Sequence, residues 1–205
     1  GYEVVVLAGG ERPLCCGRTY LGTGMVDLAK AEARRTLAAL LPWARAGVPI
    51  VGLEPSCLFS FRDEYRVLGL GTEADELSRA SLLFEEFVLR EHAAGRWTLA
   101  LNAPAGTTAL LHTHCHQKAF GVAGTVQQVL ALVRGLTVQH VESSCCGMAG
   151  SFGMEAEHVE VSRAMGELTL LPAVRAAAAD ALIVADGTSC RHQIHDLAQR
   201  RALHV

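Results

Sequence analysis

A cysteine pattern occurs twice in this chain, and this repeat constrains the fold more than any other feature. The first copy has the adjacent pair Cys15-Cys16 and a later Cys57, and the second copy has the pair Cys145-Cys146 and a later Cys190. A glycine follows each pair directly, and the later cysteine comes at nearly the same distance along the chain in both copies. Agreement in order and spacing between two halves indicates an internal duplication.

Each cysteine group follows a short run of aliphatic, mostly β-branched residues. These runs predict strands at 4–7 and 138–141 before the pairs, and at 50–53 and 181–185 before the later cysteines. The carboxyl ends of parallel strands meet at one edge of an open α/β sheet, where ligands bind. We therefore predict an α/β fold of two similar Rossmann-like lobes with parallel strands, related by a pseudo-two-fold axis.

Helical periodicity predicts a helix at 25–46 in the first copy, its counterpart at 155–179 in the second, and an additional helix at 77–94. The entry to the second lobe is predicted as a strand at 97–101, a turn at 103–106 and a strand at 109–112. The boundary is expected near residues 95–107, which gives a first domain of residues 1–100 and a second of residues 101–205. Because the first copy has no counterpart of Cys115, we expect the first lobe to be abbreviated or to lack its opening strand and helix.

Composition narrows the class of protein. The 205 residues include seven cysteines and 50% hydrophobic residues, with no signal-peptide pattern and no apolar run of membrane-spanning length. These features predict a cytoplasmic protein, with a peripheral position at the inner membrane left open. In a reducing compartment, clustered cysteines are metal ligands or redox groups more often than structural disulfides. A net charge of -3 with scattered arginines predicts no nucleic-acid partner.

The second copy supplies a complete set of thiol ligands. The candidate ligands are Cys115, Cys145, Cys146 and Cys190. Four thiolates from separate strand-end loops suit an iron-sulfur cluster or a tetrahedral zinc site. Adjacent cysteines in extended backbone point to opposite sides, so the loop must bend to bring both to one centre. Gly147 permits this bend, and Gly17 occupies the same place in the first copy, so both glycines are predicted to contact the cofactor through backbone N–H groups.

Polar residues near these cysteines allow two interpretations. The alternation of His112, His114 and His116 predicts that they share one face of a strand while Cys115 points to the other. His112 and His116 are interpreted as structural residues or as hydrogen-bond partners of ligands. His114 and His192 adjoin candidate ligands and are predicted to hydrogen-bond sulfur, with exposure to solvent as the alternative. No catalytic residue is predicted, because no paired acid and base or dinucleotide fingerprint is present.

The C-x29-CCG arrangement with a later lone cysteine resembles a known family. It is similar to the cysteine-rich CCG domain found in the B subunit of heterodisulfide reductase, in the glycolate oxidase iron-sulfur subunit and in the C subunit of anaerobic glycerol-3-phosphate dehydrogenase. The stretches 111–119, 145–153 and 186–194 are also similar to the C-terminal part of FAD-linked, iron-sulfur D-2-hydroxyacid dehydrogenases. This resemblance covers nearly the whole chain.

The resemblance implies cofactors and partners. It implies an iron-sulfur cluster of the 4Fe-4S type, with zinc as a possible substitute, and an FAD-binding domain upstream in the same or a partner polypeptide. That domain would oxidise a D-2-hydroxy acid of the lactate, glycolate or 2-hydroxyglutarate class, and a quinone or cytochrome would accept the electrons. The chain alone would then not be a complete catalyst.

The chain departs from the heterodisulfide reductase pattern at two positions. There the later cysteine belongs to a C-x2-C pair, but here the second positions are Ser60 and Gln193. The second copy still has four thiols. The first copy has only three, so it holds no cluster, uses a ligand other than cysteine, or lends its thiols to a shared centre. The three are Cys15, Cys16 and Cys57.

Three functions fit these observations. The favoured one is an electron-transfer module that carries electrons from a flavin to an external acceptor. A second is a thiol-disulfide redox domain, in which vicinal cysteines cycle between dithiol and disulfide. A third is a structural zinc-binding module that mediates an interaction.

Overall fold

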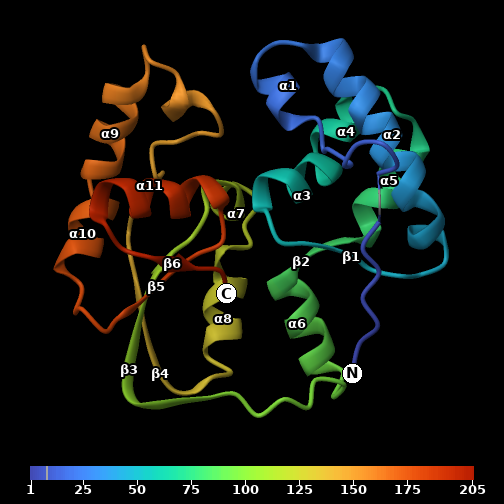
Figure 1. Ribbon diagram of the computed structural model, residues 1–205. Coiled ribbons are helices and arrows are strands. Elements are labelled where there is room, and N and C mark those ends of the chain that lie inside the picture. The colour runs from blue at the N-terminus through green and yellow to red at the C-terminus, as the bar shows by residue number, and fades with distance from the viewer. Residues whose placement is uncertain (8) are drawn as a thin grey trace. The chain divides into compact units, whose positions relative to one another are not determined.

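The computed structural model describes residues 1–7 and 9–205, which fold into two compact units (Figure 1). Unit 1 comprises residues 1–52 and 56–82, and unit 2 comprises residues 53–55 and 83–205. Among the described residues, no helix has both the length and the apolar character needed to cross a membrane.

Unit 1 is built mainly from helices. Its elements are α1 (Arg18–Gly22), α2 (Val26–Arg45), β1 (Ile50–Gly52), α3 (Pro55–Arg62), α4 (Glu64–Val67), α5 (Thr72–Ala80) and β2 (Ser81–Leu83). The long helix α2 packs against α5 through Leu37, Leu41 and Leu77, which are fully or almost fully buried. The strands β1 and β2 pair in a two-stranded sheet.

Unit 2 contains a parallel sheet with helices on both faces. The helices are α6 (Phe84–Ala93), α7 (Cys115–Ala119), α8 (Ala123–Leu130), η1 (Phe152–Met154), α9 (Val159–Glu167), α10 (Leu170–Ala176) and α11 (Thr188–Ala198). The strands are β3 (Asn102–His112), β4 (Arg134–His140), β5 (Leu182–Ala185) and β6 (Ala202–Leu203), in the order β4-β3-β5-β6, and each neighbouring pair is parallel.

Alternation along β3 explains why both faces of this sheet are covered. Leu110 packs into a core with Leu170 of α10 and Ile194 of α11. Leu111 points to the opposite face and packs with Val126 of α8. A parallel sheet buried on both sides is the arrangement of an α/β fold, so the predicted fold class and parallel strands are confirmed for unit 2.

Several predicted elements are confirmed. The helix at 25–46 is α2, and the strands predicted at 50–53, 109–112, 138–141 and 181–185 correspond to β1, β3, β4 and β5. The predicted strand at 4–7 is wrong, because these residues form no strand and Val4 and Val6 are exposed. β-branched residues favour a strand only where a neighbouring strand supplies hydrogen bonds.

The helix predicted at 77–94 is interrupted. Residues 81–83 form β2, which separates α5 from α6. The carbonyl oxygen of Ser81 accepts hydrogen bonds from Arg62, and the N–H of Leu83 donates to Glu86 at 2.8 Å. These side chains satisfy backbone groups that a continuous helix would have used, and Glu86 caps the new helix.

Two further predictions need correction. The helix predicted at 155–179 consists of α9 and α10, which are separated by Leu168 and by Thr169 with φ -151°. Residues 97–101 are not a strand, and the turn predicted at 103–106 lies inside β3. The register of β3 against β4 shifts between Asn102 and Thr107, so the turn residues produce an irregularity in the strand instead of ending it.

The two units meet in the sequence between residues 82 and 83, earlier than the predicted boundary near residues 95–107. The difference is α6, which packs against α8 and so belongs to unit 2. The division into domains at residues 1–100 and 101–205 stays a prediction.

Candidate metal centre

The four candidate ligands of unit 2 lie just beyond the carboxyl ends of three adjacent parallel strands. Cys115 begins α7 after β3, Cys145 and Cys146 follow β4, and Cys190 lies in the first turn of α11 after β5. Cys146 and Cys190 are buried, and the other two are partly buried. The sheet order β4-β3-β5 therefore gathers thiols that are far apart in the sequence.

The four thiols shift one another's pKa in series, Cys115 with Cys145, Cys145 with Cys146, and Cys146 with Cys190. The interaction between Cys115 and Cys145 raises the pKa of Cys115 and lowers the pKa of Cys145. The interaction with Cys145 raises the pKa of Cys146, and the interaction with Cys146 lowers the pKa of Cys190. Two of the four groups thus favour the thiolate, which is the form that binds metals.

Backbone N–H groups also point at these sulfur atoms. The N–H of Gly147 lies 3.3 Å from Sγ of Cys145, the N–H of Met148 donates to Cys146, and the N–H of His116 donates to Cys115. Gly147 has φ +97°, and a Cβ at this position would overlap the carbonyl oxygen of Ser162. The predicted bend after the cysteine pair is therefore present and requires glycine.

His112 lies beside Cys190. Its side chain is buried, and its Nδ1 lies 2.7 Å from Oγ of Ser143. Its Nε2 has no hydrogen-bond partner among the described residues, and after Cys146 it is one of the groups that lower the pKa of Cys190. Sequence reasoning allowed either a structural role or a ligand contact for His112. Its position as the last residue of β3 could have signalled the contact, because β5 ends beside it.

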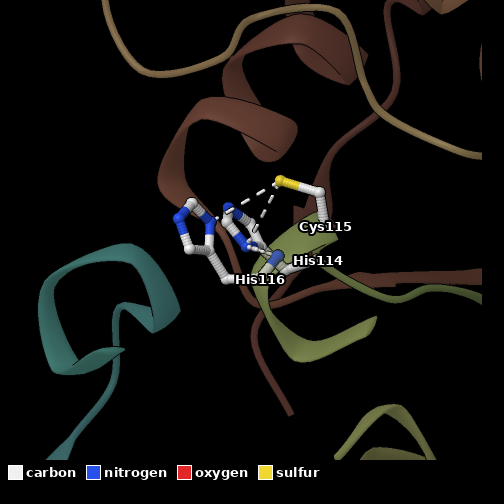
Figure 2. A group of neighbouring side chains, drawn as sticks. All are labelled: His114, Cys115 and His116. Atoms are coloured by element: carbon white, nitrogen blue, oxygen red, sulfur yellow. Dashed lines mark hydrogen bonds between the residues drawn. The ribbon is translucent and has the colours of Figure 1, made fainter. Parts of the chain in front are cut away.

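The predicted strand alternation of the three histidines is wrong, because β3 ends at His112. His114 is the N-cap of α7, where its Nδ1 accepts the N–H of His116 at 3.1 Å. Figure 2 shows the imidazole rings of His114 and His116 side by side next to the sulfur of Cys115, with ring centroids 5.1 Å apart. Sγ of Cys115 lies 3.9 Å from Nδ1 of His114 and 3.6 Å from Nδ1 of His116.

This trio of side chains has ligand atoms close enough to share a metal ion. However, the lone pair on Nδ1 of His114 already caps the helix. The arrangement therefore fits the predicted role of His114 as a hydrogen-bond neighbour of sulfur.

His192 and two basic residues near the cysteines take different positions. His192 is exposed on α11, so its predicted contact with sulfur stays a prediction. Lys118 donates to the carbonyl oxygens of Ser143 and Ser144, directly before Cys145, and burial lowers its pKa. Arg191 donates to the carbonyl oxygens of Ala185 and Asp186 and so braces the loop that leads to Cys190.

Unit 1 repeats part of this arrangement. The N–H of Gly17 lies 3.4 Å from Sγ of Cys15, and Gly17 has φ +83°. Sγ of Cys16 lies 3.2 Å from Sγ of Cys57, which follows β1 in α3. The hydrogen bond from Cys57 lowers the pKa of Cys16 to about 6, and Arg18 contributes to the same effect. The three cysteines of unit 1 therefore form one thiol pair with Cys15 beside it.

A cluster of thiols with backbone N–H donors, at the carboxyl edge of a parallel sheet, defines unit 2 as a cysteine-rich α/β domain. Comparison with protein families agrees, because residues 109–195 match the cysteine-rich domain named CCG. The matched segment contains Cys115, Cys145, Cys146 and Cys190. The resemblance found in the sequence is thereby confirmed.

Curated relatives match more of the chain. The C subunit of anaerobic glycerol-3-phosphate dehydrogenase of Escherichia coli K12 is 28% identical over 191 residues, which is 93% of this chain and 47% of the relative. D-2-hydroxyglutarate dehydrogenase of Escherichia coli K12 is 29% identical over 83% of this chain and 16% of the relative. The enzyme of the same name from Pseudomonas putida KT2440 is 34% identical over 88% of this chain and 17% of the relative. The chain spans less than half the length of each of these relatives.

Proposed function

We propose that this chain is an iron-sulfur electron-transfer module of an FAD-linked oxidoreductase. The observation that carries the proposal is the placement of four thiols just beyond the carboxyl ends of three adjacent parallel strands, where neighbouring thiols shift one another's pKa. The match to the CCG family and the two kinds of dehydrogenase among the relatives support it.

The residues at this site fit an anionic, sulfur-bound group. Cys115, Cys145, Cys146 and Cys190 supply the sulfur ligands, and the N–H groups of Gly147, Met148 and His116 already point at those sulfur atoms. When bound, an iron-sulfur cluster supplies one-electron redox chemistry at a potential that hydrogen bonds to sulfur tune. We assign the cluster to the 4Fe-4S type from the resemblance to iron-sulfur subunits with the CCG domain, and the four thiols supply the number of ligands that this type needs.

The protein's own groups would position and stabilise such a cluster. Two of the thiols already favour the thiolate, so fewer protons must leave when metal binds. His112 helps to lower the pKa of Cys190, and the ammonium of Lys118 lies at the carbonyl groups that precede Cys145. These groups offset negative charge and hold the ligand loops in place.

The wider activity follows from the relatives. We assign to the intact protein an FAD-binding domain, in the same or a partner polypeptide, that oxidises a D-2-hydroxy acid of the lactate, glycolate or 2-hydroxyglutarate class. A quinone or cytochrome would accept the electrons, with the protein in the cytoplasm or peripheral to the inner membrane. The names of the D-2-hydroxyglutarate dehydrogenases support the substrate class.

Anaerobic reconstitution with iron and sulfide tests the assignment of the cluster. We expect broad visible absorption and bound iron in the unaltered chain, and a loss of most of both in Cys146→Ser. Cys16→Ser is the matched control, because Cys16 is the second cysteine of the pair in unit 1, as Cys146 is in unit 2. Equal iron uptake by Cys146→Ser and the unaltered chain would exclude the assigned ligands. Tight zinc binding without visible absorption after reconstitution would favour the structural zinc module.

A specific observation in unit 1 supports a second candidate function, that of a thiol-disulfide redox domain. Cys16 and Cys57 are in contact, and Cys16 has a pKa of about 6, so it is a thiolate at neutral pH. A thiolate beside a second thiol is the arrangement that disulfide exchange requires. This function would belong to unit 1 and would not compete with the cluster of unit 2.

The pseudo-two-fold relation between two similar lobes also stays a prediction. The glycine turns at Gly17 and Gly147 support it, because each donates its N–H to the first cysteine of a pair. The sheets differ: β1 pairs with β2 alone, whereas β3 to β6 form a four-stranded parallel sheet.

A further inference from the structure

A second cluster of possible ligands lies in unit 2 and contains no cysteine. Glu85 is in the first turn of α6, Asp186 follows β5, and His204 follows β6. One ligand atom from each lies within 4.8 Å of the other two. Sequence reasoning assigned no role to any of these side chains.

The two carboxyl groups of this cluster are buried. Glu85 and Asp186 are each 1% exposed. Asp186 accepts hydrogen bonds from Nε2 of Gln117 at 2.8 Å and from the N–H of Val205 at 3.2 Å. Neither oxygen of Glu85 receives a hydrogen bond from the described residues. Burial, followed by the charge of Asp186, raises the pKa of Glu85 to about 9. A buried pair of this kind needs a bound proton or a bound metal ion.

The imidazole of His204 is oriented as a metal ligand would be. Its Nε2 lies 2.7 Å from the carbonyl oxygen of Leu53, to which a proton on Nε2 would donate. In that tautomer Nδ1 presents a lone pair, and it lies 3.0 Å from the backbone oxygen of Val205 and 3.6 Å from Oδ1 of Asp186. Metal-bound histidines usually donate their second N–H to a carbonyl or carboxylate in this way. The ring of Phe84 packs edge-on against the imidazole and helps to fix it.

The carboxylates of Glu85 and Asp186 and Nδ1 of His204 are therefore acceptors that face one another with no donor between them, unless one of them binds a proton. A divalent cation would satisfy all of them at once, and its charge would balance the two carboxylates. Bonds from zinc to nitrogen or oxygen are about 2.0–2.2 Å, so two ligands of one ion lie roughly 3–3.5 Å apart. The distance of 3.6 Å between Nδ1 of His204 and Oδ1 of Asp186 is close to this range.

We propose that Glu85, Asp186 and His204 bind a divalent cation through oxygen and nitrogen ligands, at a site distinct from the thiol cluster. Two carboxylates and an imidazole suit Mn2+, Fe2+ or Zn2+, whereas thiolates select softer metals and iron-sulfur clusters. The site would join the N-terminus of α6 to the segments that follow β5 and β6.

Manganese binding to the full chain tests this proposal with a probe that thiols bind poorly. Metal-free, reduced protein at pH 8 should remove the six-line electron paramagnetic resonance signal of free Mn2+, with one ion bound per chain. Glu85→Gln keeps the shape of the side chain and removes its charge, and it should weaken binding about tenfold or more. Asp196→Asn is the matched control, because Asp196 forms an exposed pair with His195 at 2.8 Å and should leave the affinity unchanged.

Two further variants keep the test decisive. His204→Gln should also weaken binding, which covers the case in which Glu85→Gln does not fold. Cys146→Ser should bind Mn2+ as the unaltered chain does, because the thiols take no part. Absence of bound Mn2+ in the unaltered chain, or equal affinity in Glu85→Gln and Asp196→Asn, would overturn the proposal and leave the carboxyl pair held by protons. Loss of binding in Cys146→Ser would overturn it as well.

Discussion

The cysteine loops of the two units share one turn but differ in what this turn brings together. In both, the glycine after the pair has a positive φ and its N–H points at the first sulfur, at 3.4 Å in unit 1 and 3.3 Å in unit 2. In both, the second cysteine of the pair interacts with the later cysteine, which lies in the helix after the next strand. Unit 2 adds Cys115, whose pKa is raised by its interaction with Cys145.

This difference shows which part of the site is local and which depends on the sheet. The glycine turn arises from three consecutive residues and therefore forms in both units. The fourth thiol comes from the end of β3, which lies between β4 and β5 in the sheet. The local turn thus places a backbone N–H at the first sulfur of each pair, and the parallel sheet is needed to bring together a set of four thiols.

Replacing the glycine of each turn should produce the largest effects. We expect Gly147→Ala to lower the free energy of unfolding by about 3–5 kcal/mol, because φ is unfavourable for alanine and the new Cβ would overlap the carbonyl oxygen of Ser162. Gly17→Ala should cost less, about 2–3 kcal/mol, because its Cβ would lie 2.7 Å from the carbonyl oxygen of Ala29. Urea unfolding of both variants measures the difference. Similar losses in both would show that the two turns are equally constrained.

The positions where heterodisulfide reductase has an additional cysteine should give a smaller contrast. Nε2 of Gln193 donates to the carbonyl oxygen and the hydroxyl of Ser162, each at 3.2 Å, in a buried environment. We expect Gln193→Ala to lower the free energy of unfolding by about 2 kcal/mol, because it leaves buried acceptors without a donor.

Ser60→Ala is the counterpart in unit 1. The hydroxyl of Ser60 donates within its own helix, to the carbonyl oxygen of Ser56 at 3.1 Å. Because alanine favours a helix and that carbonyl keeps its helical position, we expect a change below about 0.5 kcal/mol. A larger loss of unfolding free energy in Ser60→Ala than in Gln193→Ala would contradict the expectation that the buried hydrogen bonds of Gln193 stabilise the protein more than the hydrogen bond of Ser60.

The smallest effect concerns reactivity. Because Cys57 lowers the pKa of Cys16 to about 6, the rate at which iodoacetamide modifies Cys16 should rise between pH 5 and 7 and then level off. An ordinary thiol would continue to gain reactivity up to about pH 9. Mass spectrometry of peptides after timed labelling provides the rates. In Cys57→Ser the midpoint should move to higher pH, because the largest cause of the shift is removed; an unchanged midpoint would contradict this origin.

The sequence predicted the elements in which local pattern and long-range packing agree. The helix at 25–46 and the strands before Cys145 and Cys190 have strong periodicity and formed as expected. The helix at 77–94 did not, because the hydrogen bonds that interrupt it come from Arg62 and Glu86. Periodicity in one segment carries no information about donors elsewhere in the chain.

The candidate sites show the same limit. The thiols were predictable, because cysteine is rare and its spacing repeats. The cluster of Glu85, Asp186 and His204 could not be predicted, because these common residue types lie in three distant segments and no local pattern shows that the fold brings them together. The role of Gln117, which accepts from the N–H of His114 and donates to Asp186, was hidden for the same reason.

The position of β3 in the middle of the sheet has a consequence for the order of events during assembly. Each strand that leads to a thiol of unit 2 must pair in parallel with a partner distant in the sequence. Such contacts form slowly, because closing the long loop between the strands costs chain entropy before the contact can stabilise the fold. In the unfolded chain, Cys115 and Cys190 belong to separate stretches with no reason to meet. Insertion of the proposed cluster would therefore follow the formation of the sheet, and a chain that has not yet paired β3 with β5 offers only the vicinal thiols that its glycine turn provides.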